Sequence, residues 1–152
     1  VPAFSGLFSP HWDETARGSL FGLTRFSNKS HMARAVLESV AFQTYELLES
    51  MEKDLDTEFE SLKVDGGMVA NNLLMQFQSD LLDKSIHSQE INEITALGVG
   101  VASYLYVKDL PLSSISNYIS SSITWNPNMS NETRINSLES WYKAIEKAKN
   151  WL

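Results

Sequence analysis

The sequence of 152 residues contains no cysteine, and this absence excludes both a disulfide framework and a cysteine-ligated zinc site. No apolar run approaches the ~18 residues that a membrane-spanning helix requires. Basic residues are scarce: 12 lysines and arginines stand against 19 aspartates and glutamates, a net charge of −7. Nucleic acids and anionic membranes call for basic patches, so the composition argues against both as partners. No secretion signal opens the chain, and with the missing cysteines this favours a cytoplasmic protein.

Hydrophobic residues make up 43% of the chain, which suits one domain over 1–152 with a sizeable core. Prolines and glycines break up residues 1–27, which predicts extended segments and turns there rather than a helix. Apolar residues at spacings of three and four then predict a helix over 28–55, capped by Ser27 or Asn28. The apolar stripe of this helix consists of Met32, Val36, Leu37, Val40, Ala41, Leu47, Leu48, Met51 and Leu55. The polar residues predicted to face water are Glu46, Glu49, Glu52 and Lys53.

The middle of the chain has a strand–helix–strand–helix pattern. Alternating residues predict a strand at 61–65, and a weaker strand follows at 85–89. Helices are predicted over about 71–84 and about 92–107. This order predicts parallel strands joined by right-handed crossovers. The buried face of the first helix is predicted to hold Leu73, Leu74, Phe77, Leu81 and Leu82. The small residues that predict close packing of the second helix are Ala96, Gly98, Gly100, Ala102 and Ser103.

The last part of the chain divides into a loop and a helix. Residues 108–129 are rich in serine, asparagine and proline, with a short apolar insert at 118–120, and are predicted to form a loop. A clear amphipathic helix is predicted over 130–152. Its apolar face comprises Ile135, Leu138, Trp141, Tyr142, Ile145, Ala148, Trp151 and Leu152. We interpret the Trp141–Trp151 face as core or domain-contact surface rather than a cofactor site.

Two adjacent glycines, Gly66 and Gly67, separate the predicted strand from the helix that follows it. Glycine allows positive φ and removes the Cβ atom, so a flat ligand can lie against the backbone. Ligands of open α/β sheets sit beyond the carboxyl ends of the strands, where these glycines fall. Asn71, near the helix start, has a donor and an acceptor that could bind a nucleobase or ribose. A tight turn followed by an ordinary N-cap explains the same residues, and the pattern alone leaves both interpretations open.

The surrounding sequence favours the ligand-binding interpretation through a resemblance. "VDGGMVANNLLMQFQSDLL" resembles the adenosine-binding segment of glycerol kinases, which belong to the FGGY family of carbohydrate kinases. "GSLFGLTRFSNKSHMARAVLE" is similar to the C-terminal signature of that family, and "VPAFSGLFSPHWDETARG" and "EITALGVGVASYL" resemble the segments on either side. The resemblance covers roughly residues 1–107 and continues more weakly to the C-terminus.

The resemblance implies a partial ribonuclease-H-like, actin-like ATPase domain of the α/β class, with sheet strands missing on its N-terminal side. It implies ATP or ADP with Mg²⁺ as the cofactor and glycerol as the substrate, bound through an N-terminal domain that this sequence lacks. Gly67 and Asn71 match nucleotide-contact positions of the family, and Gly66 is added on geometric grounds. No catalytic residue and no metal ligand is expected within this sequence.

Because one wall of a nucleotide pocket cannot hold nucleophile, metal and phosphates in line, we expect this chain alone to be inactive. Another FGGY sugar kinase stays open as an alternative, as does a non-catalytic remnant or a split subunit that binds a partner. Without its neighbouring strands, the strand at 61–65 would expose an unpaired edge, which predicts self-association into a homo-oligomer.

The remaining polar candidates are scattered along the sequence. His11, His31 and His87 show no metal-binding spacing; His31 is predicted to be a polar helix-start residue, and His11 stands where the family more often has tyrosine. Among the carboxylates Asp13, Glu14 and Asp65, the last follows the strand and is predicted to make structural hydrogen bonds. Arg17 and Arg25 could contact an anion, although a solvated or salt-bridged role is the ordinary one.

Overall fold

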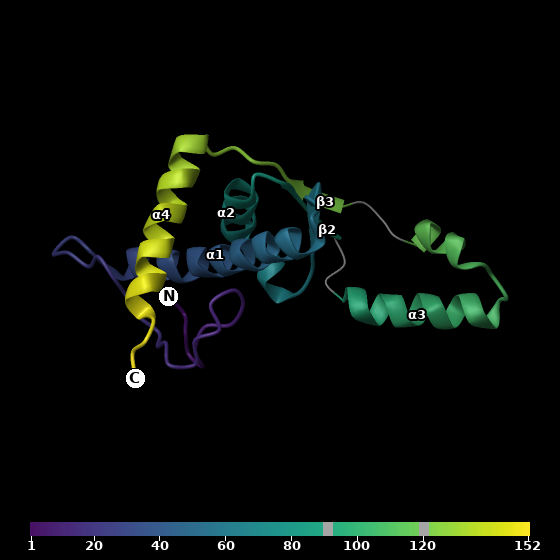
Figure 1. The fold of residues 1–152 in the computed structure, drawn as a ribbon. Helices are drawn as coiled ribbons and strands as arrows, with labels where there is room; N and C mark the ends of the chain where they lie inside the picture. Colours follow the sequence, from purple (N-terminus) through teal and green to yellow (C-terminus); the bar gives the residue numbers. More distant parts are fainter. Residues whose placement is uncertain (90–92, 119–121) are drawn as a thin grey trace.

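The computed structural model describes residues 1–89, 93–118 and 122–152 and shows a mixed α/β fold (Figure 1). Residues 1–27 form turns and isolated bridges without a helix, as predicted. The helices are α1 (Lys29–Leu55), α2 (Asn72–Leu82), α3 (Ile94–Val107) and α4 (Asn131–Ala148), with 3₁₀ turns η1 (Gly67–Ala70) and η2 (Leu112–Tyr118). The strands are β1 (Ser61–Val64), β2 (Ser85–Gln89) and β3 (Ser122–Trp125). No helix among the described residues is both long and apolar enough to cross a membrane.

The three strands form one sheet in the order β1-β2-β3. β1 and β2 run parallel with Leu62 opposite Ile86, and α2 connects them, so the predicted pairing is confirmed. β3 runs antiparallel to β2, with Trp125 opposite Ile86. The prediction of a loop over 108–129 is therefore wrong, because this segment contains η2 and β3. A four-residue strand is too short to show clear alternation, and the part of the segment at 119–121 lies outside the described residues.

β1 lies at one end of the sheet, and in the described ranges no other strand pairs with its outer side. An unpaired edge of this kind is a template for another strand. The homo-oligomer expected from the sequence stays a prediction.

The core lies where α1, α2 and α4 meet. The rings of Phe42 and Trp141 stack with centroids 4.9 Å apart and an interplanar angle of 4°. The ring of Phe77 in α2 packs against that of Phe42 edge to face, with ring centroids 5.6 Å apart and an interplanar angle of 75°. The side chain of Phe42 therefore joins all three helices. The predicted buried face of α2 is confirmed at Leu74, Phe77, Leu81 and Leu82, but Leu73 is exposed.

The inner face of α1 differs from the prediction in one important respect. Glu46 was expected to face water, yet it is 3% exposed and its Oε1 lies 2.7 Å from Nε2 of His11. Conversely, five residues that were assigned to the apolar stripe are exposed: Met32, Val36, Leu47, Met51 and Leu55. The periodicity of the helix could not reveal that the loop before it would bring a histidine onto its inner face.

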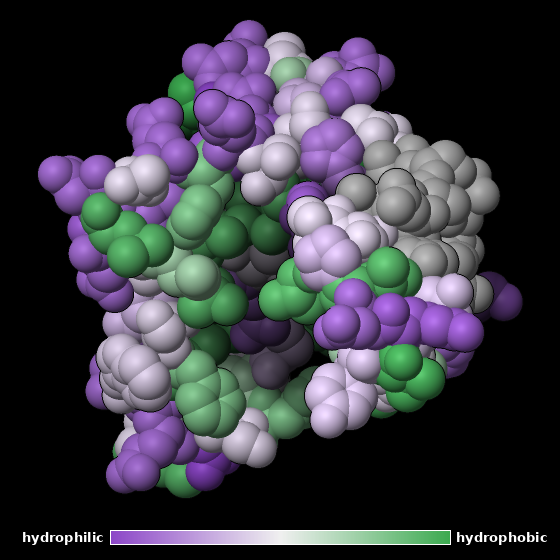
Figure 2. All heavy atoms as spheres, turned by 90° about the vertical axis from the view of Figure 1, so that its right-hand side faces the viewer, coloured by the Kyte–Doolittle hydropathy of each residue, from purple (hydrophilic) through white to green (hydrophobic). Residues whose placement is uncertain are grey.

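α3 projects away from the other helices with η2 beside it (Figure 1). The close packing predicted from its small residues is wrong: a Cβ atom at Gly98 or Gly100 would meet no atom within 4 Å. Val99, Tyr106 and Val107 are exposed, and hydrophobic residues surround a hollow on the face seen in Figure 2. The predicted start of this helix, near Asn92, lies outside the described residues.

α4 is shorter than predicted. It begins after Ser130, whose Oγ accepts a hydrogen bond from Thr133 N–H, and it ends at Ala148. Trp141, Ile145 and Ala148 are buried as expected. Ile135, Trp151 and Leu152 are exposed, so the predicted apolar face is too wide at both ends.

The three-ring contact makes Phe42→Ala strongly destabilising. We expect the free energy of unfolding to fall by about 3–5 kcal/mol, because a buried aromatic side chain leaves a cavity and two ring contacts are lost. Urea unfolding followed by circular dichroism measures the change. Val36→Ala, on the exposed face of the same helix, is the matched control and should change stability by less than about 1 kcal/mol. Equal losses in the two variants would contradict this account of the core.

Candidate functional site

The loop between β1 and α2 has a backbone that only glycine adopts readily. Gly66 has φ 93° and ψ 175°, a combination in which a Cβ atom would be strained. Gly67 then begins the single 3₁₀ turn η1, which leads into α2. A Cβ atom placed on either glycine would meet no atom within 4 Å. The end of β1 is therefore open rather than filled by packed apolar side chains, as a ligand lying on the backbone requires.

Asn71 is the N-cap of α2 and is half-buried. Its Oδ1 accepts a hydrogen bond of 3.1 Å from Leu74 N–H, which satisfies one of the unpaired amides of the first turn. None of the described residues accepts a hydrogen bond from its Nδ2. The ordinary N-cap and the ligand-binding interpretation are therefore compatible, because the oxygen holds the helix while the amide nitrogen keeps its donors.

A cavity of 390 Å³ lies at the carboxyl ends of β1 and β2. Its walls comprise Lys63, Val64, Asp65, His87, Gln89 and Ile94. Nδ1 of His87 lies 2.9 Å from Oγ1 of Thr124, which holds the imidazole against β3. The carboxylate of Asp65 is exposed and makes no hydrogen bond with any residue that the structure describes, so its predicted structural role is not confirmed.

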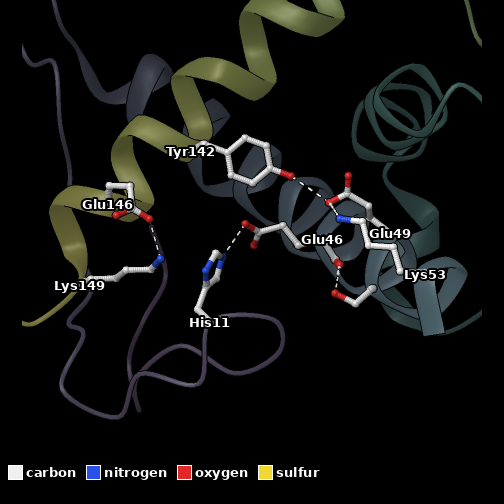
Figure 3. Close-up of polar contacts among 8 residues, drawn as sticks. His11, Glu46, Glu49, Lys53, Tyr142, Glu146 and Lys149 are labelled. Carbon is white, nitrogen blue, oxygen red and sulfur yellow. Dashed lines mark hydrogen bonds and ion pairs between the residues drawn. The ribbon is translucent and has the colours of Figure 1, made fainter.

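A second group of polar residues joins the N-terminal loop and α4 to α1 (Figure 3). Besides the His11–Glu46 contact, the hydroxyl of Tyr142 donates to Oε2 of Glu49 at 3.2 Å. Burial, with the negative charge of Glu49 beside it, raises the pKa of Tyr142. Nζ of Lys149 lies 2.6 Å from Oε1 of Glu146 on the same side of α4. These contacts hold elements together and show no nucleophile with an activating base.

The other histidines and the arginines make local contacts. His31 accepts a 3.2 Å hydrogen bond from Asn28 N–H and completes a capping box, so its predicted helix-start role is confirmed. Arg17 donates to the backbone carbonyls of Glu14 and Ala16, and Arg25 lies over the ring of Phe26. Across the described ranges, no three acidic or histidine side chains gather closely enough to hold a metal ion.

Comparison with known proteins adds to this geometry. Residues 1–104 match the model of the C-terminal domain of the FGGY family of carbohydrate kinases. The chain belongs to this family. A glycerol kinase of Nocardia farcinica is 50% identical over 99% of the chain, and one of Brucella anthropi is 46% identical over all of it. The chain spans about a third of these relatives, 32% and 31% of their lengths.

Solved structures of the family share the fold. The crystal structure of Plasmodium falciparum glycerol kinase with ADP superposes with a TM-score of 0.87 at 37% identity, over 97% of this chain and 30% of that one. A xylulose kinase from Lactobacillus acidophilus gives a TM-score of 0.75 at 24% identity, with the same coverage, and supports the fold alone. The resemblance noted in the sequence and the α/β fold class are both confirmed.

The two glycines should respond differently to alanine. Gly66→Ala would place a Cβ atom at φ 93°, and we expect it to lower the free energy of unfolding by about 1–3 kcal/mol. Gly67→Ala is the matched control, because its φ is not in the left-handed region and the space around it is open, so its stability should change little. Urea unfolding of both variants measures the difference. A stable Gly66→Ala protein would mean that the loop does not need its glycine conformation.

Asp13 should make stability depend on pH in acid. Its carboxylate accepts hydrogen bonds from Thr15 and Ala16 and from Asn150 N–H beyond α4, and these bonds lower its pKa to about 2. The unfolded value is about 3.9, so the stabilisation is complete above that pH and disappears as the pH falls towards 2.

We expect the urea midpoint of Asp13→Asn to lie below that of the unchanged protein at pH 6, with the difference shrinking between pH 4 and 2. Glu14→Gln, at the exposed neighbouring position, should follow the unchanged protein throughout. If the difference in urea midpoint stayed constant across this range, the ionised carboxylate of Asp13 would not be the source of the stabilisation.

Proposed function

We propose that this chain supplies the adenosine-binding wall of an ATP-dependent glycerol kinase, which converts glycerol and ATP to glycerol 3-phosphate and ADP. The observation that supports it best is the open backbone at Gly66 and Gly67, followed by a half-buried Asn71 whose Nδ2 is unused. A purine or ribose can lie on the glycine backbone, and the Asn71 amide can donate to it. Identity of 46–50% to two glycerol kinases favours glycerol over the sugars of other branches.

The chemistry at the phosphates needs groups that this chain does not bring together. Phosphoryl transfer depends on positioning the nucleophile in line and on neutralising the charge of the phosphates, usually with Mg²⁺. As the family resemblance implies, we expect the Mg²⁺ ligands and the general base to lie in other parts of the kinase. The contribution of this chain is to hold the adenosine end of ATP. We place the reaction in the cytoplasm and expect the chain alone to be catalytically inactive.

Asn71→Ser tests the nucleotide wall without removing the helix cap. Serine is also a good N-cap, so α2 should persist, whereas the amide donor is lost. We expect affinity for ADP, measured by isothermal titration calorimetry, to fall at least about fivefold, which is the loss of one hydrogen bond of about 1 kcal/mol. Gly67→Ala should weaken ADP binding similarly, because its Cβ atom enters the space that the nucleotide would use.

Asn72→Ser, at the exposed first residue of α2, is the matched control and should bind ADP as the unchanged protein does. Unchanged affinity in both Asn71→Ser and Gly67→Ala would remove the site assignment. A glycerol kinase assay of the chain alone, and mixed with the remaining portion of the Nocardia farcinica enzyme, tests the activity. Turnover by the chain alone would contradict the proposal, and turnover only in the mixture would support it.

A further inference from the structure

The segment from Leu7 to Asp13 folds back on itself as a short hairpin. Two backbone hydrogen bonds of 2.8 and 2.9 Å between these two residues close its base. His11 lies in the hairpin tip, which we define as residues 8–12, and its imidazole points at Glu46 of α1 (Figure 3). Within the described ranges, the 2.7 Å contact between these two side chains is the one hydrogen bond or ion pair that joins the hairpin tip to α1.

The backbone of the hairpin tip is strained at Trp12. Its φ of 48° lies in the left-handed region, which a bulky aromatic residue rarely adopts. The side chain of Trp12 is 75% exposed and that of Phe8 is 69% exposed, so burial of these rings does little to offset the strain. A strained conformation persists only where the surrounding contacts hold it. Here those contacts are the hydrogen bonds at the base of the hairpin and the His11–Glu46 pair at its tip.

A cavity of 230 Å³ lies between the hairpin tip and α1. The residues that line it are Leu7, Phe8, Ser9, His11, Gln43, Glu46 and Leu47. The hairpin tip is therefore not closely packed on the helix, and it can move without disturbing the ring contacts of the core. When the imidazole of His11 moves away, water can enter this space and hydrate the carboxylate of Glu46.

Glu46 depends on His11 for a compensating positive charge. Its carboxylate is 3% exposed, and a buried carboxylate is costly unless it is paired. The two other carboxylates labelled in Figure 3 each pair with a lysine: Glu49 with Lys53 at 3.4 Å, and Glu146 with Lys149 at 2.6 Å. In the described part of the chain, no lysine or arginine forms an ion pair with Glu46.

The other charges around the imidazole favour an added proton. Lys149 and, after it, His11 lower the pKa of Glu146, so the imidazole also lies in the field of this carboxylate. Carboxylates outnumber ammonium groups in this cluster. Its titratable members besides His11 are Asp13 on the same loop, Glu46, Glu49 and Lys53 on α1, and Tyr142, Glu146 and Lys149 on α4 or directly after it.

Histidine is the side chain whose charge ordinarily changes between about pH 5 and 8. We propose that the His11–Glu46 pair is a pH-sensitive latch, which holds the hairpin tip on α1 while the imidazole carries its proton and releases it as the pH rises through this range. A neutral imidazole can still donate one hydrogen bond, but it no longer balances the buried carboxylate. Release allows Trp12 to leave its left-handed conformation. The inference does not depend on nucleotide binding.

The absence of cysteine permits a direct test, because two introduced cysteines are the only sites that a nitroxide label can modify. Phe8→Cys puts one label on the hairpin tip, and Val36→Cys puts the other on the exposed side of α1, roughly 15 Å along the helix from Glu46. Double electron–electron resonance measures the distribution of distances between the labels. We expect a narrow distribution at about pH 6 and a broad second component whose share is at least about threefold larger at about pH 8.5.

Three substitutions in the doubly labelled protein identify the group responsible. His11→Gln keeps a hydrogen-bond donor but has no charge to lose, so its broad component should be large and equal at both pH values. His31→Gln is the matched control and should keep the pH response, because glutamine also completes the capping box of α1. Trp12→Gly removes the strain, so its broad component at the higher pH should be smaller than that of the doubly labelled protein. Circular dichroism confirms that each variant is folded before it is compared.

Three results would overturn the proposal. An identical distance distribution at the two pH values would mean that the hairpin tip is held independently of the imidazole charge. A pH response that survives in His11→Gln would assign the change to another titratable group. A broad component that is larger at the lower pH would show that the neutral imidazole, and not the charged one, holds the hairpin tip on α1.

Discussion

The ring contact of Phe42 with Trp141 and Phe77 is the interaction on which the rest of the structure depends. It joins α1, α4 and α2 at one point, although the three side chains are far apart in the sequence. Offset aromatic contacts are directional, so they fix how the helices cross as well as burying apolar surface. Since α2 is fixed at Phe77, its first turn is fixed too, and with it the glycine loop that enters it. The open backbone at the end of β1 is thus positioned from the core, against which Val69 of η1 also packs.

A polar contact supports this arrangement from the N-terminal side. Glu46 lies on the buried face of α1, where an unpaired carboxylate would be costly, and His11 meets it at 2.7 Å. Asp13, two residues further on, binds Asn150 N–H beyond the end of α4. The loop before α1 therefore contacts α1 at Glu46 and the residues just after α4 at Asn150. His11 therefore has a structural role.

The sequence predicted an element correctly where the local spacing of its apolar residues was clear. It predicted α1, α2 and the parallel pair β1 and β2, because these elements have clear apolar patterns and short connections. It failed where a distant segment decided the outcome: Glu46 is buried because of a loop residue 35 positions away. β3 was missed because a four-residue strand in a serine-rich segment has almost no pattern of its own. The place of the glycine loop and the positive φ of a glycine in it were predicted, but the 3₁₀ turn η1 was not. The unpaired indole of Trp141 could be found only from coordinates.

The small residues of α3 show a second limit of pattern reasoning. Glycine and alanine on a helix predict a close neighbour, yet nothing lies near Gly98 or Gly100. Such a sequence loses helix stability and gains no close contact at these glycines among the described residues. The same reasoning applies to nucleotide binding. A ligand held by one wall loses nearly all of its translational and rotational freedom but gains only part of the contacts, so its affinity is low. Catalysis requires in addition that the phosphates be held in line from the opposite side. Within the described residues, the glycine loop and α3 share one feature: nothing packs against the glycines of either segment.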